Sequence, residues 1–505
     1  MAISSESAAG AMQEKSLAGI GSWVFAGPLI LIFCLALLVP FITNDYWVLI
    51  ATRAAIYWVL VGALNLVIGF AGQLAIGYVA LLTLGAYTTS VLVAGNVSPP
   101  VPVFAALAIA GVAGAIFGVI VGLPALRLRT FYFAISTLGF ATIITQIALA
   151  WQSVTGGGIG LPGPEMPAPF HTHAGFYFFC LAAAGLITWM TANIAYSRFG
   201  RGLIAVRDAD VAAEATGIRK ARLLMTIFVF TGASAAIAGG LFAALQTYIT
   251  PDAFTFDLSV LFFISILIGG RGSILGPLIG TVILTLLPEF AAPLAAWSTF
   301  LYAVLLLVIV LVAPGGIAAL LDFGNRRALQ ANRTIVPKAA LVGHLLAMDK
   351  AKSGIALRGV VLSFLGVRAI DGVDLDVEAG KIHGLIGPNG SGKTTILNVI
   401  SGFYGPEAGS IALGGQALKP GDSESRASQG IARTFQTPRI VGEASVLQNV
   451  MIGGTIQRPK HIRRIASLFA PAPPRRTNAA IRSDDRIVRG RAGKSRGHSR
   501  GPAAT

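Results

Sequence analysis

The sequence predicts an α-helical membrane domain of about ten transmembrane helices, followed by a partial α/β domain with a phosphate-binding loop (P-loop) and a disordered basic tail. The first observation is composition: 54% of the 505 residues are hydrophobic and 12% are charged, whereas soluble domains carry about 25% charged residues. The second is that residues 22–196 contain only five charged residues. The third is a glycine-rich motif at 387–394, where strand-like and helix-like segments alternate.

Ten apolar segments are candidate membrane spans, since a helix needs about 20 apolar residues to cross a bilayer. We expect the membrane domain to occupy residues 22–317, after a cytoplasmic segment at 1–21. The eighth and ninth segments are short, which favours tilted, discontinuous or partly re-entrant helices. The predicted spans are residues 22–43, 47–69, 74–94, 101–123, 131–151, 175–196, 224–247, 255–269, 275–290 and 297–313.

Basic residues predict the orientation of these helices, because Lys and Arg resist translocation. They follow the fourth, sixth and eighth predicted spans, so these loops and both termini are expected in the cytoplasm. Arg53 lies just inside the second span, near enough to its end for the side chain to reach the interface. The loop residues are Arg127, Arg129, Arg198, Arg201, Arg207, Arg219, Lys220, Arg222 and Arg271.

Residues 458–505 hold 13 of the 38 basic residues but only 2 of the 22 acidic ones, and therefore most of the net charge of +16. This segment is rich in Arg, Pro and Ala and has no helix or strand period, which predicts disorder. The change of composition near Gln457 also fits translation out of frame. A tail that binds nucleic acid or lipid is a further alternative, but the rest of the chain has an ordinary charge and no nucleic-acid partner is expected.

The run Gly387-Pro-Asn-Gly-Ser-Gly-Lys393-Thr394 fits the P-loop motif G-x-x-x-x-G-K-[ST] in full. An expected strand at 382–386 precedes it and an expected helix at 394–401 follows, which is the context in which such loops bind phosphate. Main-chain N–H groups would hold phosphate oxygens, Lys393 would reach the β and γ phosphates, and Thr394 would hold Mg²⁺. The expected ligand-binding residues are Gly387, Asn389, Gly390, Ser391, Gly392, Lys393, Thr394 and Thr395.

Two further features resemble ATP-binding cassette (ABC) proteins. The run at 430–436 resembles their Q-loop, and Phe364 stands where the family stacks an aromatic ring on adenine. The resemblance implies that ATP and Mg²⁺ are cofactors and that Gln436 contacts Mg²⁺ and the attacking water. Residues 354–457 would then be the N-terminal part of a cassette, joined to the membrane domain by a linker at 318–353.

The membrane half resembles the permeases of branched-chain amino acid ABC importers. The segment 207–217 resembles the coupling helix that such permeases dock onto a cassette, and Glu214, Ala215 and Gly217 would form the contact. The alternative for this segment is a solvated charged loop. The runs that match the permeases are residues 63–69, 72–77, 124–129, 155–158 and 265–270.

A complete cassette also has a Ser-Gly-Gly signature, an apolar strand ending in Asp-Glu and a switch histidine, and the sequence contains none of these motifs. The run Leu413-Gly-Gly-Gln416 copies part of the signature but precedes Gln436, so we expect a strand turn there. His461 and His498 lie in the tail and do not match the switch histidine. The resemblance therefore implies nucleotide binding without a complete catalytic site.

The sequence as a whole predicts an importer permease for branched-chain or other small amino acids, in a bacterial inner (plasma) membrane, that carries an incomplete cassette. Its implied partners are a second permease subunit, a complete ABC ATP-binding subunit, an external substrate-binding protein and a small amino acid. Apart from Arg53 near the end of its span, no charged residue inside the spans is expected to bind an amino acid's ammonium and carboxylate groups, so specificity is expected in the external binding protein. Three alternatives remain: a self-contained membrane ATPase, a urea or amide importer permease, and a basic-tailed membrane anchor.

Overall fold

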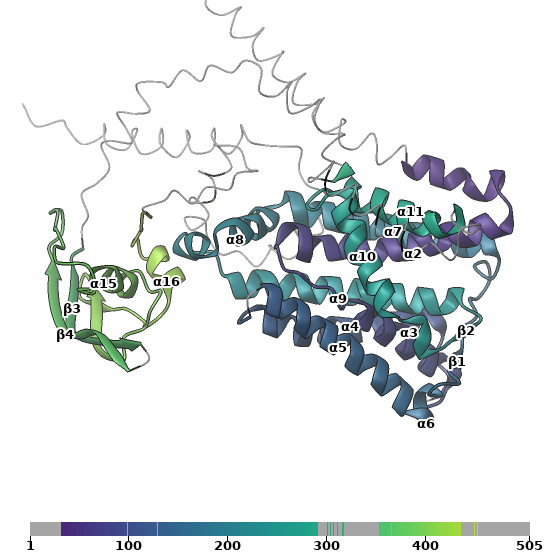
Figure 1. The fold of residues 1–505 in the computed structure, drawn as a ribbon, viewed down its shortest axis with the longest axis horizontal. Coiled ribbons are helices and arrows are strands. Elements are labelled where there is room, and N and C mark those ends of the chain that lie inside the picture. The colour runs from purple at the N-terminus through teal and green to yellow at the C-terminus, as the bar shows by residue number, and fades with distance from the viewer. Residues whose placement is uncertain are drawn as a thin grey trace, which may run out of the picture. The chain divides into compact units, whose positions relative to one another are not determined.

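A computed structural model describes a helical region at 32–290 and an α/β region at 353–435, without positions 98, 129 and 365 (Figure 1). It also describes isolated positions at 300, 304, 307, 311, 316, 317, 449 and 452. Gln436, Arg129, the N-terminal segment, most of the predicted linker and tenth span, and the tail at 458–505 lie outside these residues. The short apolar helix Ile32–Ile42 belongs to a separate compact unit.

Each of the eight predicted spans between residues 47 and 290 coincides with a helix. Within the described residues, six candidate spans are long and apolar enough to cross a membrane, and α3 and α11 are shorter apolar helices. A count of ten spans is not established by these helices. The long helices are α2 (Asp45–Asn65), α3 (Val79–Ala94), α4 (Val103–Ala125), α5 (Thr130–Ala150), α7 (His173–Tyr196), α8 (Arg198–Ala215), α9 (Lys220–Leu245), α10 (Phe256–Gly269) and α11 (Leu275–Phe290).

Short elements complete the helical region. The π-helix η1 (Leu66–Phe70) continues α2, the single turn α6 (Gln152–Thr155) follows α5, and the 3-10 helix η2 (Pro251–Ala253) precedes α10. Strands β1 (Leu161–Pro162) and β2 (Tyr248–Ile249) pair antiparallel.

The third predicted span starts later than expected, because residues 72–77 form no helix. Non-helical backbone at membrane depth is stable only where its polar groups find partners inside the protein. Here the N–H groups of Ile76 and Gly77 both donate to Thr137 Oγ1, each at 3.2 Å. The partner comes from α5, about 60 residues away, and a local apolar pattern contains no sign of it.

Glycines let the central helices approach closely. A Cβ atom on Gly232 of α9 would lie 2.3 Å from the carbonyl oxygen of Gly114 on α4, and one on Gly85 of α3 would lie 2.0 Å from that of Ala236. Small residues at helix contacts allow such packing in membranes. A side-chain hydrogen bond adds to it between α2 and α7, where Trp58 Nε1 donates to Thr188 Oγ1 at 2.6 Å.

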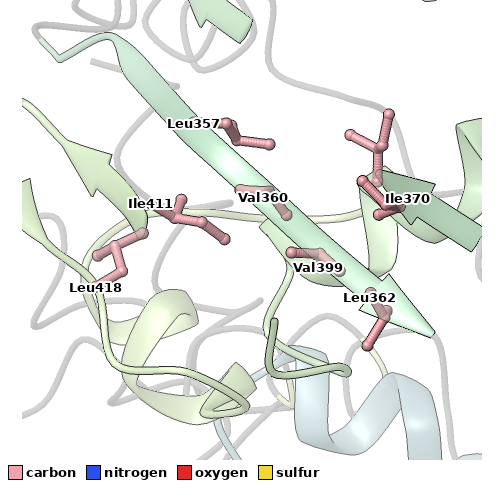
Figure 2. Close-up of a cluster of buried hydrophobic side chains, with 8 residues drawn as sticks. Leu357, Val360, Leu362, Ile370, Val399, Ile411 and Leu418 are labelled. Atoms are coloured by element: carbon pink, nitrogen blue, oxygen red, sulfur yellow. The ribbon is translucent and has the colours of Figure 1, made fainter. Parts of the chain in front are cut away.

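The α/β region contains an antiparallel sheet of order β4-β3-β5-β6. The hairpin turn between β5 and β6 confirms the predicted strand turn at 413–416. Side chains from the sheet, from α15 and from the residue after β6 form a buried apolar cluster (Figure 2), which consists of Leu357, Val360, Leu362, Ile370, Ile396, Val399, Ile411 and Leu418. The elements are β3 (Ile355–Phe364), β4 (Val367–Val377), α15 (Lys393–Ile400), β5 (Ala408–Leu413), β6 (Gln416–Ala417) and α16 (Ser423–Ser428).

The predicted strand at 382–386 is wrong. Residues 381–388 form no regular element, and the side chains of Ile382 and Ile386 are fully exposed and 93% exposed. An apolar strand of this kind is normally buried between neighbouring strands. In the described residues the sheet pairs β3 with β4 and β5, and no strand lies beside 382–386.

Candidate functional site: a phosphate-binding loop and a coupling segment

The P-loop curls around its own lysine. Lys393 Nζ donates to the carbonyl oxygens of Gly387 at 2.8 Å and Pro388 at 2.6 Å, and lies 3.4 Å from Ser391 Oγ. Gly390 and Gly392 have φ of +88° and +80°, a conformation that favours glycine. The ammonium group is therefore held inside the loop, where an incoming phosphate would replace the two carbonyls as its partner.

The loop residues suit a phosphate ligand. Asn389, Gly390, Ser391 and Thr394 are exposed, and Gly392 is the N-cap of α15, so the first N–H groups of the helix follow directly. These orphan donors and the helix dipole favour an anion. The structure thus brings Lys393, the loop glycines and the start of α15 together, as the motif predicts.

Phe364, the predicted adenine platform, ends β3 with a half-exposed ring. A Cβ on Gly392 would lie 2.7 Å from the carbonyl oxygen of Ala369, so the P-loop abuts β4 of the hairpin that carries Phe364. The Phe364 ring packs edge-on against Tyr404, with centroids 5.1 Å apart. Stacking on adenine from this position therefore stays a prediction.

The predicted coupling segment is a separate turn at the end of α8. Ala209 interrupts the helix with φ −156° and ψ 74°. The helix ends at Ala215, and Gly217 closes it with φ +78° and an N–H that donates to the Glu214 carbonyl at 2.9 Å. The Glu214 side chain is half-buried, and this burial is the main reason why the pKa of its carboxyl is raised.

Comparison with known proteins agrees with both parts of this architecture. The family model described as "Branched-chain amino acid transport system / permease component" matches residues 46–313, more than half of the chain. The chain belongs to this permease family. A second model, "ABC transporter", matches residues 370–490. The protein is thus a fusion of a permease domain with an ABC domain, and the ABC match extends past the predicted boundary at 457.

Individual relatives match the two domains separately. The permease is 30% identical over 318 residues to the "High-affinity branched-chain amino acid transport system permease protein LivM" of Salmonella typhimurium, covering 57% of this chain and 74% of the relative. It is 29% identical to LivM of Escherichia coli, with the same coverage. The ABC domain is 43% identical over 99 residues to "Arabinose import ATP-binding protein AraG 2" of Burkholderia cenocepacia, covering 20% of this chain and 19% of the relative.

Two arginines of the ABC domain were not singled out from the sequence. Arg426 is buried and donates to the carbonyl oxygens of Val399, Ile400 (2.7 Å) and Lys419 (3.1 Å), so it caps the C-terminus of α15. Burial lowers its pKa below the usual arginine value. Arg433 donates to Asn398 Oδ1 at 2.7 Å and lies over the rings of Phe403 and Phe435. Together these arginines fix the helix that begins with Lys393.

Proposed function

We propose that this chain is a permease subunit that imports branched-chain or other small amino acids, and that its own cassette is incomplete. The family match over residues 46–313 carries the transport part. Its permease relatives are named for branched-chain amino acid transport, and this name supplies the substrate class. The cassette's relatives are named for arabinose import, but they match only a region of 99 residues, so the permease carries more weight for the substrate.

Exposure of an apolar segment supports the incomplete cassette. Ile382 and Ile386 stand in solvent, although they lead directly into the P-loop. Burying them would take neighbouring strands, and the sequence holds no signature motif and no apolar strand ending in Asp-Glu downstream. We therefore propose that 354–457 is the N-terminal part of a cassette and that 458–505 is a basic tail, although the ABC family match runs on to residue 490.

Nucleotide binding is proposed for the P-loop. Its residues would hold the phosphates of ATP, with Lys393 supplying the charge and Thr394 and Gln436 holding Mg²⁺. The fit is supported by the Lys393 ammonium group, which donates to neutral oxygens of the loop, those of Gly387, Pro388 and Ser391. ATP supplies the free energy for transport, and here the chain's own residues would bind it without completing hydrolysis.

A complete cassette in a separate subunit would then drive transport by docking at the predicted coupling segment 207–217, in which residues 210–217 form the separate turn. The kink at Ala209 and the turn at Gly217 set this segment apart as a short unit, and Ala215 allows a partner helix to approach closely. Glu214 would give the partner an acidic contact. A second permease subunit, an external substrate-binding protein, about ten spans, an inner-membrane location and cytoplasmic termini complete the proposal.

Reconstitution tests this proposal. The full chain would be placed in proteoliposomes with the second permease, complete cassette and binding protein of a branched-chain amino acid importer. We expect ATP-dependent uptake of radiolabelled leucine that unlabelled isoleucine, but neither arabinose nor urea, suppresses. Replacing the P-loop lysine of the separate cassette should abolish leucine uptake, whereas Lys393→Ala in this chain should leave uptake unchanged. Uptake of urea alone, or loss of uptake in Lys393→Ala, would contradict the proposal.

A further inference from the structure

Arg207 of α8 ties two distant segments of the permease together. Its Nη1 donates to the carbonyl oxygen of Gly69 at 2.7 Å, and its Nε donates to Asp208 Oδ1 at 2.8 Å. The side chain is only 15% exposed. A largely buried guanidinium shared between a main-chain carbonyl and a carboxylate is a strong tie, because its hydrogen bonds are charge-assisted.

The Gly69 carbonyl is available because of the local helix geometry. Gly69 lies in η1, where the Ala71 N–H donates back to Leu66 and that of Gln73 to Val67. The last carbonyls of a helix lack N–H partners and carry the negative end of its dipole. The Arg207 guanidinium therefore satisfies the C-terminal end of the α2–η1 helix, and π-helical turns are often found at functional sites.

The loop between α10 and α11 also contacts the end of α2. Asn65 Nδ2 donates to the Ser273 carbonyl at 2.7 Å, and the Gly272 N–H donates to Asn65 Oδ1 at 3.1 Å. A Cβ on Gly69 would lie 2.3 Å from the Gly272 nitrogen. The end of α2, the loop between α10 and α11, and α8 thus converge within one small cluster.

This cluster has room to rearrange. A cavity of about 320 Å³ lies beside it, lined by Arg207, Asp208 and Arg271 and by residues of η1, the 72–77 segment and α10. The helix break at Ala209 follows Arg207 by two residues, and Ala213 beyond the break packs with Ala205 and Val206 before it. A displacement of the segment 210–217 would therefore be passed to the first part of α8. This cavity offers the Arg207 side chain space away from Gly69.

We infer that Arg207 is a positioning residue that transmits movement of the segment 210–217 to the end of α2 and to the α10–α11 loop. The inference rests on the proposed transport function. In one state Arg207 holds the Gly69 carbonyl, and in the other it is withdrawn into the cavity. A residue that links two such states contributes to the coupling between ATP use and transport.

The first test measures leucine uptake per ATP hydrolysed by the reconstituted transporter. Arg207→Met should lower this ratio about tenfold, a typical size for coupling between sites, while hydrolysis by the separate cassette continues. Arg207→Lys keeps the charge but not the forked geometry of the guanidinium. Its ratio of uptake to hydrolysis should lie between those of Arg207→Met and wild type. Arg222→Met is the matched control, because it removes an exposed arginine from the same cytoplasmic side, and its ratio should equal that of wild type. An unchanged ratio in Arg207→Met, or equal loss of uptake and hydrolysis, would overturn the inference.

The second test needs no substrate. Leu74 lines the cavity, so Leu74→Cys in a Cys34→Ser, Cys180→Ser background reports access to it by a water-soluble maleimide. Trapping the separate cassette with ATP and vanadate should change the labelling rate, and adding Arg207→Met should remove that response. The inference would be overturned if the labelling rate still changed on trapping in the Arg207→Met protein. It would also be overturned if the rate did not change in the Leu74→Cys protein that keeps Arg207. Absence of leucine uptake with an intact labelling response would instead contradict only the substrate assignment.

Discussion

Arg53 on α2 and Glu289 on α11 form an ion pair across the permease, with 3.9 Å between Nη1 and Oε1. The Tyr46 hydroxyl donates to the same carboxylate. The sequence predicted only that Arg53 would reach the interface, yet the structure also gives it an acidic partner from the far end of the domain. The Arg53 and Glu289 side chains are 33% and 17% exposed, so the pair is partly desolvated but still accessible to water.

Removing both charges should therefore cost less than the sum of the costs of removing each one alone. We expect Arg53→Met and Glu289→Gln each to lower the free energy of unfolding, and the double variant to recover about 1 kcal/mol relative to their sum. Denaturant unfolding of the four proteins in detergent measures this coupling. Additive effects would show that the pair contributes nothing beyond its separate side chains.

The close approach of α4 and α9 should be sensitive to a single methyl group. Gly232→Ala places a Cβ 2.3 Å from the Gly114 carbonyl oxygen, a backbone atom that cannot move alone. We expect a loss of about 2 kcal/mol or more in unfolding free energy, as in other overpacked cores. Gly139→Ala on α5 is the control, since nothing lies within 4 Å of its Cβ position. Equal stability of the two variants would refute this packing.

The sequence predicted the positions of the helices well because the signal for a span is local. About 20 apolar residues in a row carry it, whatever surrounds them. Contacts across long separations were not predictable in the same way. The unwound segment 72–77 depends on Thr137, and the end of α2 depends on Arg207 and Gly272.

The difference between local patterns and long-range contacts also explains which parts of the cassette were predicted correctly. The P-loop is a local motif, and Lys393 and the start of α15 lie where it predicts. The strand at 382–386 failed because a strand needs neighbours, and apolar character alone does not supply them. The contacts that Arg426 and Arg433 make with α15 follow no pattern in the sequence, since arginine is usually exposed. Gln436 lies outside the described residues, so its role stays a prediction.

Glu214 should make stability depend on pH. Burial raises the pKa of its carboxyl above the unfolded value, against an opposing effect of Lys220. The folded state then binds the proton more tightly, so stability falls as the pH rises from the unfolded pKa through the folded one. We expect Glu214→Gln to unfold at a higher temperature than wild type at about pH 7.5, with the difference shrinking towards about pH 4. Thermal unfolding of the full chain in detergent measures it, and Glu165→Gln, at an exposed carboxyl, is the control. A difference independent of pH would contradict the role of burial.

Lys393 should dominate nucleotide affinity in the cassette. Lys393→Ala removes the one ammonium group held inside the described P-loop, and we expect binding of a fluorescent ATP analogue to weaken about tenfold or more. Lys381→Ala serves as the control, because that exposed lysine pairs with Glu378 outside the loop. Chelating Mg²⁺ should weaken binding by wild type as well. Equal affinity of wild type and Lys393→Ala would remove the basis for a nucleotide site.

ATP hydrolysis requires more catalytic groups than ATP binding, so we expect this chain to bind ATP without hydrolysing it. Phosphoryl transfer to water needs a group that orients the water and donors that stabilise charge on the γ-phosphate. Lys393 and Thr394 serve binding, and the sequence holds no signature motif, no Asp-Glu after an apolar strand and no matching switch histidine. We therefore expect the purified chain to hydrolyse ATP no faster than Lys393→Ala, and hydrolysis to appear only when a complete cassette is added. Hydrolysis by the chain alone that Lys393→Ala abolishes would mean that residues beyond 435 supply the missing catalytic groups, and the proposal of an incomplete cassette would fall.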